Sequence, residues 1–417
     1  MQSELFFAKT KNRNNFIICG FCLSIALFIH LLNLKIFLPP YNVIGIFFFI
    51  GVFFSLISFK YGVVSKDVFK ILLINIFSIL FLLISYLFNQ VVDIYFFKEN
   101  ILYHIVMLFS AFFIITLLDY FLSKDVSRFN FVSFLIVIVI IFQLLLSFAA
   151  YLSPGLYNIV FSIFSSPADL DNFNSFNETR MVTLGASFFG SGVVNVFTLI
   201  LISFLITKEN SIKILIFLLF SYFVVAVIGM FSSRSTIIGI LFSLFIIFFN
   251  KHNIRVSIVI VLTLISSYFL LSNINFDNDS RFLNLVSFGL EFLFDFSNSQ
   301  AAKSTSELAD MWSIWPTEVK TWLIGDVFYR NENSYYMDTD VGYMRIIFAN
   351  GLVGLFLFYL THYYLLSRIN QFNLFVKFVI LCALITLHSK GIGSFVPFLS
   401  LLFFAALIDN KRLYKGG

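Results

Sequence analysis

Twelve apolar runs, each long enough to cross a lipid bilayer, set the strongest limit on what this chain can fold into. A spanning helix needs about 17–25 predominantly apolar residues, because every backbone polar group must be hydrogen-bonded within the segment. The composition agrees: 60% of the 417 residues are hydrophobic and 12% are charged, whereas soluble domains carry about 25% charged residues. We therefore predict an all-α polytopic membrane protein, with residues 1–417 forming a single transmembrane domain. The predicted spans are 16–33, 43–59, 69–89, 101–122, 131–152, 182–206, 212–231, 235–250, 255–272, 342–366, 372–388 and 392–408.

The positions of Lys and Arg predict the orientation of these spans. Cytoplasmic loops of membrane proteins are enriched in Lys and Arg. When both termini are placed in the cytoplasm, the inner segments hold 17 of the 27 Lys and Arg residues but only 6 of the 22 Asp and Glu residues. This arrangement leaves two larger loops on the outer side, at residues 153–180 and 273–341. In the second loop, SRFLNLVSFGLEFLFDF and TSELADMWSIWPTEVKTWLIG have the apolar spacing of short amphipathic helices.

Several arginines fall on the outer side, where the orientation rule disfavours them, and four of them are candidates for a site: Arg180, Arg234, Arg281 and Arg345. A single such arginine is equally compatible with an anchor whose charged end reaches the headgroups. Three of the four stand at the edges of spans, and together they favour an anion site in an outer cleft. The planar guanidinium donates hydrogen bonds in pairs and keeps its charge, which suits phosphate. Beside acyl chains, the expected anion is a lipid-linked phosphate or pyrophosphate.

Small residues follow the first of these arginines, in the stretch RMVTLGASFFGSGVVN that begins at Arg180. Gly185, Gly190 and Gly192 give this segment a face without bulky side chains. Such a face ordinarily permits close packing between helices. The alternative is that a substrate chain or a broken helix passes there.

The second outer loop ends in polar and aromatic residues next to Arg345. Asp338 and Asp340 are candidate general bases beside a phosphate-binding arginine, or else solvated loop acids or caps of the next helix. His388, on the last outer turn, is a further candidate for the cleft. The loop's aromatic residues are either a belt at the membrane interface or platforms on which sugars stack. They are Trp312, Trp315, Trp322, Tyr335 and Tyr336.

Three stretches resemble a known family, the bacterial Wzy-type O-antigen (oligosaccharide repeat unit) polymerases, and more distantly the O-antigen ligases. The first is RMVTLGASFFG, in which an outer arginine opens a glycine-rich span. The second is SSRSTIIG, the turn that carries Arg234. The third is the loop exit DVGYMRIIFANGLVGLF. In ligase-like relatives a histidine stands eleven residues before the glycine of the loop exit, whereas this chain has Asp340 eleven residues before Gly351.

The resemblance implies a GT-C-like integral-membrane glycosyltransferase of the bacterial inner membrane that needs no metal or cofactor. Its donor would be a glycan on undecaprenyl pyrophosphate and its acceptor a repeat unit on the same lipid. Arg180 and Arg234 would neutralise the leaving pyrophosphate and Asp340 would deprotonate the acceptor. Arg345, Arg281, Asp338 and His388 would contribute to binding. Membrane lipids and a polysaccharide chain-length regulator are the implied partners, and nucleic acid is not one.

Two other functions fit the same chain. An O-antigen ligase would share the fold and the donor. A flippase or other transporter would carry charged residues inside its spans and pseudo-symmetric halves, whereas these spans are nearly free of acidic residues and one outer loop dominates.

Overall fold

The computed structural model describes residues 13–34, 43–60, 66–123, 126–164, 173, 180–185, 188–249, 285–286, 288–289, 309–330 and 335–415. Over these ranges the regular structure is helical, with one isolated β-bridge between Arg330 and Tyr335. The predicted all-α class is confirmed for them. Six helices in the described ranges are long and apolar enough to cross a membrane: 66–89, 94–121, 128–152, 189–208, 212–232 and 342–367.

Helices occupy eleven of the twelve predicted positions, and the remaining one, 255–272, lies outside the described residues. The helices are α1 (Arg13–Leu32), α2 (Val43–Lys60), α3 (Lys66–Asn89), α4 (Ile94–Phe96) continued by the π-helix η2 (Phe97–Leu102) and α5 (Tyr103–Phe121), α6 (Arg128–Leu152), α7 (Pro154–Phe164), α9 (Phe189–Lys208), α10 (Ile212–Ser232), α11 (Thr236–Phe248), α15 (Val319–Ile324), the 3-10 turn η4 (Tyr336–Asp338), α16 (Gly342–Ser367), α17 (Leu374–Leu387) and α18 (Val396–Lys415).

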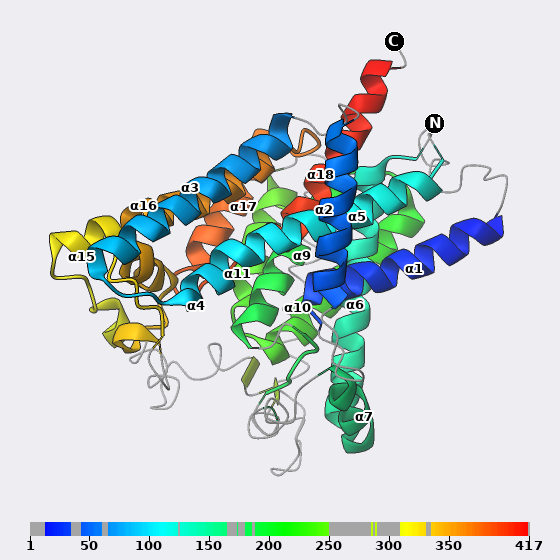
Figure 1. The fold of residues 1–417 in the computed structure, drawn as a ribbon. Helices are drawn as coiled ribbons and strands as arrows, with labels where there is room; N and C mark the ends of the chain where they lie inside the picture. The colour runs from blue at the N-terminus through cyan, green and yellow to red at the C-terminus, as the bar shows by residue number, and fades with distance from the viewer. Residues whose placement is uncertain are drawn as a thin grey trace. The chain divides into compact units, whose positions relative to one another are not determined.

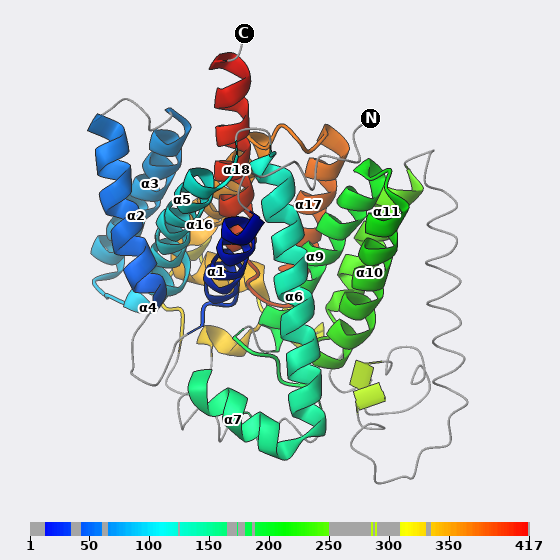
Figure 2. The same cartoon turned by 90° about the vertical axis from the view of Figure 1, so that its right-hand side faces the viewer.

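The chain divides into two compact units, each assembled from segments that are distant in sequence. Unit 1 comprises Met1–Val43, Phe121–Asn298 and Phe372–Ala383. Within it α9 packs against α10 and α11, and α6 packs against α1, α7 and α10 (Figure 2). Glycines allow the close approach: a Cβ at Gly239 of α11 would lie 2.7 Å from the Cα of Val196 in α9. Close packing is thus one use of small residues in this unit.

Unit 2 comprises Ile44–Tyr120, Ser299–Gln371 and Leu384–Gly417. Here α3 and α16 run side by side, and α15 packs against both (Figure 1). The predicted span 342–366 is not a continuous helix, because Asn350 and Gly351 have non-helical backbone angles. Gly351 has φ +63°, and a Cβ there would lie 2.2 Å from the carbonyl oxygen of Leu323. The kink therefore lets α15 lie directly against α16.

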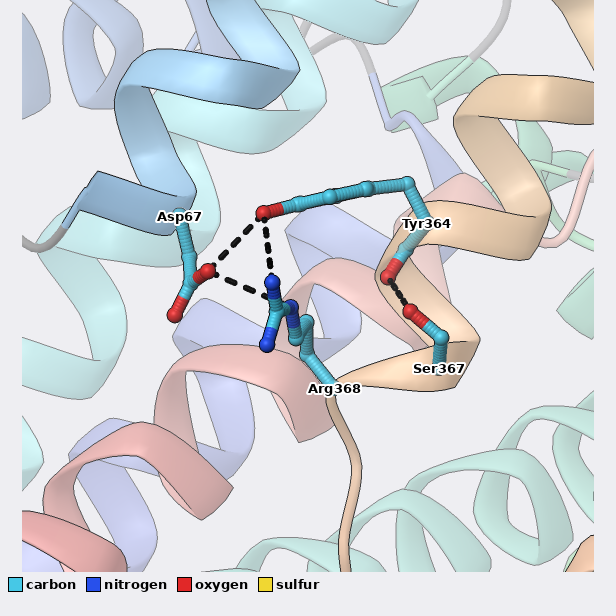
Figure 3. A network of polar contacts seen from close by, with 4 residues as sticks. All are labelled: Asp67, Tyr364, Ser367 and Arg368. Atoms are coloured by element: carbon cyan, nitrogen blue, oxygen red, sulfur yellow. Dashed lines mark hydrogen bonds and ion pairs between the residues drawn. The ribbon is translucent and has the colours of Figure 1, made fainter.

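At one end of unit 2, a polar network joins α3 to the end of α16. Arg368 Nε lies 3.2 Å from Asp67 Oδ1, and the Tyr364 hydroxyl donates to the same carboxylate at 2.8 Å (Figure 3). The sequence places these residues on the cytoplasmic side. At the other end of α3, Asn89 Nδ2 donates to Gly325 O at 3.1 Å, and both residues are predicted to be on the outer side. Each of these contacts therefore joins two segments that the sequence predicts to lie on the same side of the membrane.

The span predicted at 182–206 begins later than expected. Residues 181–185 are not helical, and α9 begins only at Phe189. Gly185 has φ +75°, and a Cβ there would lie 2.4 Å from the carbonyl oxygen of Leu32. The stretch that begins at Arg180 therefore starts with a buried, non-helical segment, 181–184, which its apolar composition does not reveal.

Candidate functional site

Arg180 and Arg234 lie over the same aromatic ring in unit 1. The guanidinium carbon of Arg234 is 4.8 Å from the centroid of the Phe288 ring, and that of Arg180 is 5.9 Å from the same centroid. Arg180 also lies 4.0 Å from the centroid of Phe188. Both arginines are half-buried. The structure therefore brings together two of the predicted site residues, although 54 positions separate them in the sequence.

A backbone hydrogen bond holds the two arginine-bearing segments together. The amide of Met181 donates to the carbonyl of Phe231 at 3.1 Å. Met181 directly follows Arg180, and Phe231 stands three residues before Arg234. The main chain itself thus fixes how the two arginines are placed.

Two side chains of α6 hydrogen-bond both polar backbone groups of Leu184, in the non-helical segment 181–184. Gln143 Nε2 donates to Leu184 O at 2.7 Å, and Leu184 N donates to Ser147 Oγ at 3.2 Å. Met181, Val182 and Leu184 are almost completely buried, and buried backbone groups need such partners. Non-helical backbone at membrane depth is tolerated where protein surrounds it in this way. Gln143 and Ser147 are therefore positioning residues for Arg180.

The turn that carries Arg234 rests on α9. Ser233 N donates to Gly229 O and Thr236 N donates to Ser233 O, both at 3.0 Å, so the chain reverses between α10 and α11 within a few residues. A Cβ at Gly192 of α9 would lie 2.6 Å from Ser233 Oγ. Asn195, one turn further along α9, donates to Thr236 Oγ1 at 3.1 Å. A glycine and an amide on α9 therefore define where Arg234 stands.

The two arginines influence each other electrostatically. Burial, and second the positive charge of Arg234, lower the pKa of Arg180 to about 10. Arg180 is still charged at pH 7, because that value lies well above neutrality. Holding two like charges close together in a partly desolvated place costs free energy, and an anion bound between them would offset that cost. The pair is thus suited to a multiply charged anion.

Arg345 lies in the first turn of α16, in unit 2. Its guanidinium carbon is 3.3 Å from the centroid of Tyr335 and 4.7 Å from that of Tyr329. The residue is buried, and its Nε has no hydrogen-bond partner among the described residues. Arg345 is therefore held by aromatic stacking, as the arginines of unit 1 are.

The two candidate carboxylates differ in their surroundings. Desolvation raises the pKa of Asp340, and the positive charge of Arg345 opposes that rise. Asp338 is exposed and has φ +51°, in the short turn η4. The N-cap residue of α16 is Val341, without a side-chain cap hydrogen bond, so the capping interpretation of the two acids does not describe this helix. Asp340, which is also exposed, is electrostatically linked to Arg345.

His388 is completely buried in unit 2. Its Nε2 lies 2.8 Å from Gly393 O, and its Nδ1 lies 2.7 Å from the Tyr359 hydroxyl. Because a carbonyl only accepts, Nε2 carries the proton and Nδ1 accepts from the tyrosine. Both nitrogens are thus used within the protein, an arrangement that favours a packing role over the predicted binding role.

One predicted site residue, Arg281, lies outside the described residues. Conversely, the aromatic partners Phe188 and Phe288 were not predicted, because nothing distinguishes them among the 61 phenylalanines of the sequence. Comparison of the chain with protein-family models, with curated proteins and with solved structures finds no match.

Proposed function

We propose that the chain is an integral-membrane glycosyltransferase that polymerises undecaprenyl-pyrophosphate-linked oligosaccharide repeat units into O-antigen at the periplasmic face of the bacterial inner membrane. The observation that supports this function most directly is the shared placement of Arg180 and Arg234 over Phe288. Two guanidinium groups side by side match the charge of a pyrophosphate. The apolar helices of the same unit suit a lipid-linked substrate.

In this reaction a hydroxyl of the acceptor repeat unit attacks the anomeric carbon of the donor sugar. The new glycosidic bond forms as the bond between that carbon and the pyrophosphate oxygen breaks. A general base takes the proton of the attacking hydroxyl, a contribution of about 10²–10⁴ in rate, and Asp340 is the residue that the resemblance implies for this role. Arg180 and Arg234 neutralise the negative charge that develops on the leaving undecaprenyl pyrophosphate. Loss of one such electrostatic group typically costs about 10²–10³ in turnover.

The test is complementation of a strain that lacks the gene, with lipopolysaccharide resolved on gels. We expect Arg180→Ala and Arg234→Ala to leave core with a single repeat unit, and Arg234→Lys to retain part of the polymer ladder. The matched control is Arg330→Ala, because Arg330 is also predicted to be on the outer side but already pairs with Glu99 at 2.7 Å. Full-length polymer from the Arg180 or Arg234 alanine variants would contradict the role given to the two arginines.

The phenotype of the deletion strain separates the competing functions. Loss of a polymerase leaves core carrying one repeat. Loss of a ligase leaves core alone, and loss of a flippase strands single repeats on the cytoplasmic face. Either of the last two outcomes would replace the function proposed here.

A further inference from the structure

Unit 2 contains an open cleft of about 410 Å³, and Arg180, Arg234 and Arg345 are not among the residues that line it. Its walls come from the end of α3, from residues 315–328 and from the turn η4. Clefts of about 300–1,000 Å³ are typical of sites for small ligands. The sequence assigns the surrounding segments to the outer side, where the proposed reaction takes place.

Two stacked aromatic pairs contribute rings to the lining of the cleft, which includes Trp315, Phe328 and Tyr336. Trp315 stacks on Trp322 with ring centroids 5.7 Å apart and an interplanar angle of 21°. Phe328 stacks on Tyr336 at 5.4 Å and 26°. Trp315 is 48% exposed and Phe328 is 38% exposed, so each pair presents a ring to the cleft. Stacked rings of this kind are rigid and lose little conformational entropy when a ligand covers them.

Hydrogen bonds fix the aromatic pairs in place. Trp322 Nε1 donates to Pro316 O at 2.9 Å. The Tyr336 hydroxyl donates to Asp326 Oδ2 at 3.5 Å, and Thr321 Oγ1 donates to Asp326 Oδ1 at 2.6 Å. Burial, and then the negative charge of Asp326, raise the pKa of Tyr336, so this hydroxyl remains a donor at neutral pH. The platforms are thus formed before any ligand arrives.

Polar groups stand around the aromatic rings. Glu318, Asp326, Lys320 and Asn89 all line the cleft. Carboxylates and amides are the partners that sugar hydroxyls use, since each hydroxyl both donates and accepts. An acyl chain would leave these polar groups unsatisfied, and a phosphate would meet two carboxylates against a single lysine. A sugar matches both features, because one face of its ring is lined with C–H groups and its rim carries hydroxyls.

We propose that this cleft binds a sugar of the glycan substrate, with the ring face on Trp315 and Phe328 and the hydroxyls on Glu318, Lys320 and Asn89. The identity of the glycan rests on the proposed function, whereas the sugar chemistry rests on the cleft. The cleft would hold the saccharide itself, independently of the pyrophosphate that the arginines bind.

The experiment uses the full chain in lipid nanodiscs and the lipid-free repeat-unit oligosaccharide, released by mild acid from the strain that carries the gene. Binding is measured by saturation-transfer NMR and calorimetry. We expect Trp315→Ala to weaken binding at least tenfold and Glu318→Gln, at an exposed position, to weaken it several-fold. Trp312→Phe is the matched control. The ring centroid of Trp312 lies 6.0 Å from that of Tyr343, and Trp312 is not among the residues that line the cleft. The affinity of this variant should equal that of the unaltered chain.

Unchanged affinity in Trp315→Ala and Glu318→Gln, or no binding by the unaltered chain, would overturn the sugar site. The Arg234→Ala variant separates this inference from the proposed function. If it stops polymerisation in cells while the unaltered chain fails to bind the oligosaccharide, the cleft proposal is wrong and the polymerase proposal stands. If the cleft binds the oligosaccharide while a strain that lacks the gene still makes the full polymer ladder, the reverse holds.

Discussion

Aromatic rings decide how the outer arginines of this chain are held. Arg180, Arg234 and Arg345 each have the guanidinium carbon within 5 Å of a Phe or Tyr ring centroid. Stacking occupies the face of the guanidinium, whereas its N–H groups lie in the plane of the group. Such cation–π contacts contribute about 0.5–2 kcal/mol each. The rings therefore orient the arginines without neutralising them.

Phe288 is the residue whose loss should separate the two arginines of unit 1. We expect Phe288→Leu to weaken pyrophosphate binding to the purified protein about tenfold, because loss of about 1.4 kcal/mol corresponds to that factor. Calorimetry with inorganic pyrophosphate measures the effect. Phe288→Tyr keeps the ring and is the control. Equal affinities for the Leu and Tyr variants would show that the shared ring does not organise the pair.

Asp340 gives the proposed reaction a defined dependence on pH. A general base must be deprotonated, so the rate should fall as pH decreases through the raised pKa of Asp340. The charge of Arg345 lowers that pKa. Arg345→Gln should therefore move the acid limb of the pH–rate profile to higher pH, while Arg345→Lys should move it less. The rate of polymer formation in membrane vesicles gives the profile. An acid limb that does not move in Arg345→Gln would exclude Asp340 as the base.

At the scale of elements, two segments depart from the predicted helices. One lies next to Arg180, a proposed site residue, and the other lies next to a wall of the cleft. The non-helical segment 181–184 lies between Arg180 and α9, and the kink at Asn350 and Gly351 accommodates α15, which follows Trp315 and Glu318. Hydropathy predicts where apolar residues are buried. It cannot predict either departure, because the residues that these segments contact, Gln143 and Leu323, are distant in the sequence.

Gln143 should control the position of Arg180. Gln143→Leu leaves the carbonyl of Leu184 without its side-chain donor, at a cost of about 1–3 kcal/mol. We expect shorter polymer in complemented cells and a lower unfolding temperature. Ser133→Ala, on the same helix, is the matched control, because Ser133 Oγ donates only within α6, to Phe129 O. If both variants lower polymer length equally, Gln143 acts through general stability alone.

Replacement of Gly351 by alanine should destabilise the protein more than the same replacement at Gly155. Gly351→Ala places a Cβ 2.2 Å from Leu323 O. The backbone at φ +63° and ψ −173° is one that essentially only glycine adopts, and it alone costs about 1–3 kcal/mol. The protein should lose at least that much stability, measured by thermal unfolding in detergent. A Cβ at Gly155 in α7 meets no atom within 4 Å, so Gly155→Ala should be neutral or slightly stabilising. Similar melting temperatures for the two variants would contradict the strain assigned to Gly351.

At the scale of the whole molecule, the sequence predicts the helices well and their breaks poorly. Runs such as 43–59 and 212–231 coincide with α2 and α10 to within one residue at each end, because length and hydrophobicity alone decide those helices. Arg180 and Arg234 were predicted as site residues because the sequence places them on the outer side, where the orientation rule disfavours arginine. Their common ring and the backbone link between them were not, because a contact between distant segments leaves no mark on local composition.

The predicted orientation is testable by labelling. In a chain with Cys19, Cys22 and Cys382 replaced by Ser, a membrane-impermeant maleimide should label Glu318→Cys in intact spheroplasts. Lys66→Cys, which is also at an exposed position, should react only after the membrane is permeabilised. Gel shifts with a maleimide polymer report both reactions. Labelling of both positions from the same side would require a different number of spans between them.

The hydrogen bond between Met181 and Phe231 joins two main-chain groups. Every amino acid can supply the carbonyl, and every amino acid except proline can supply the amide N–H. Substitutions around the two arginines can therefore accumulate over evolution without altering the distance between their charges. An insertion or deletion between Arg180 and Gly185 would instead change the spacing between Arg180 and the residues that anchor this segment. In a lineage whose saccharides diversify, we expect the side chains of this region to drift while the length of the segment stays constant.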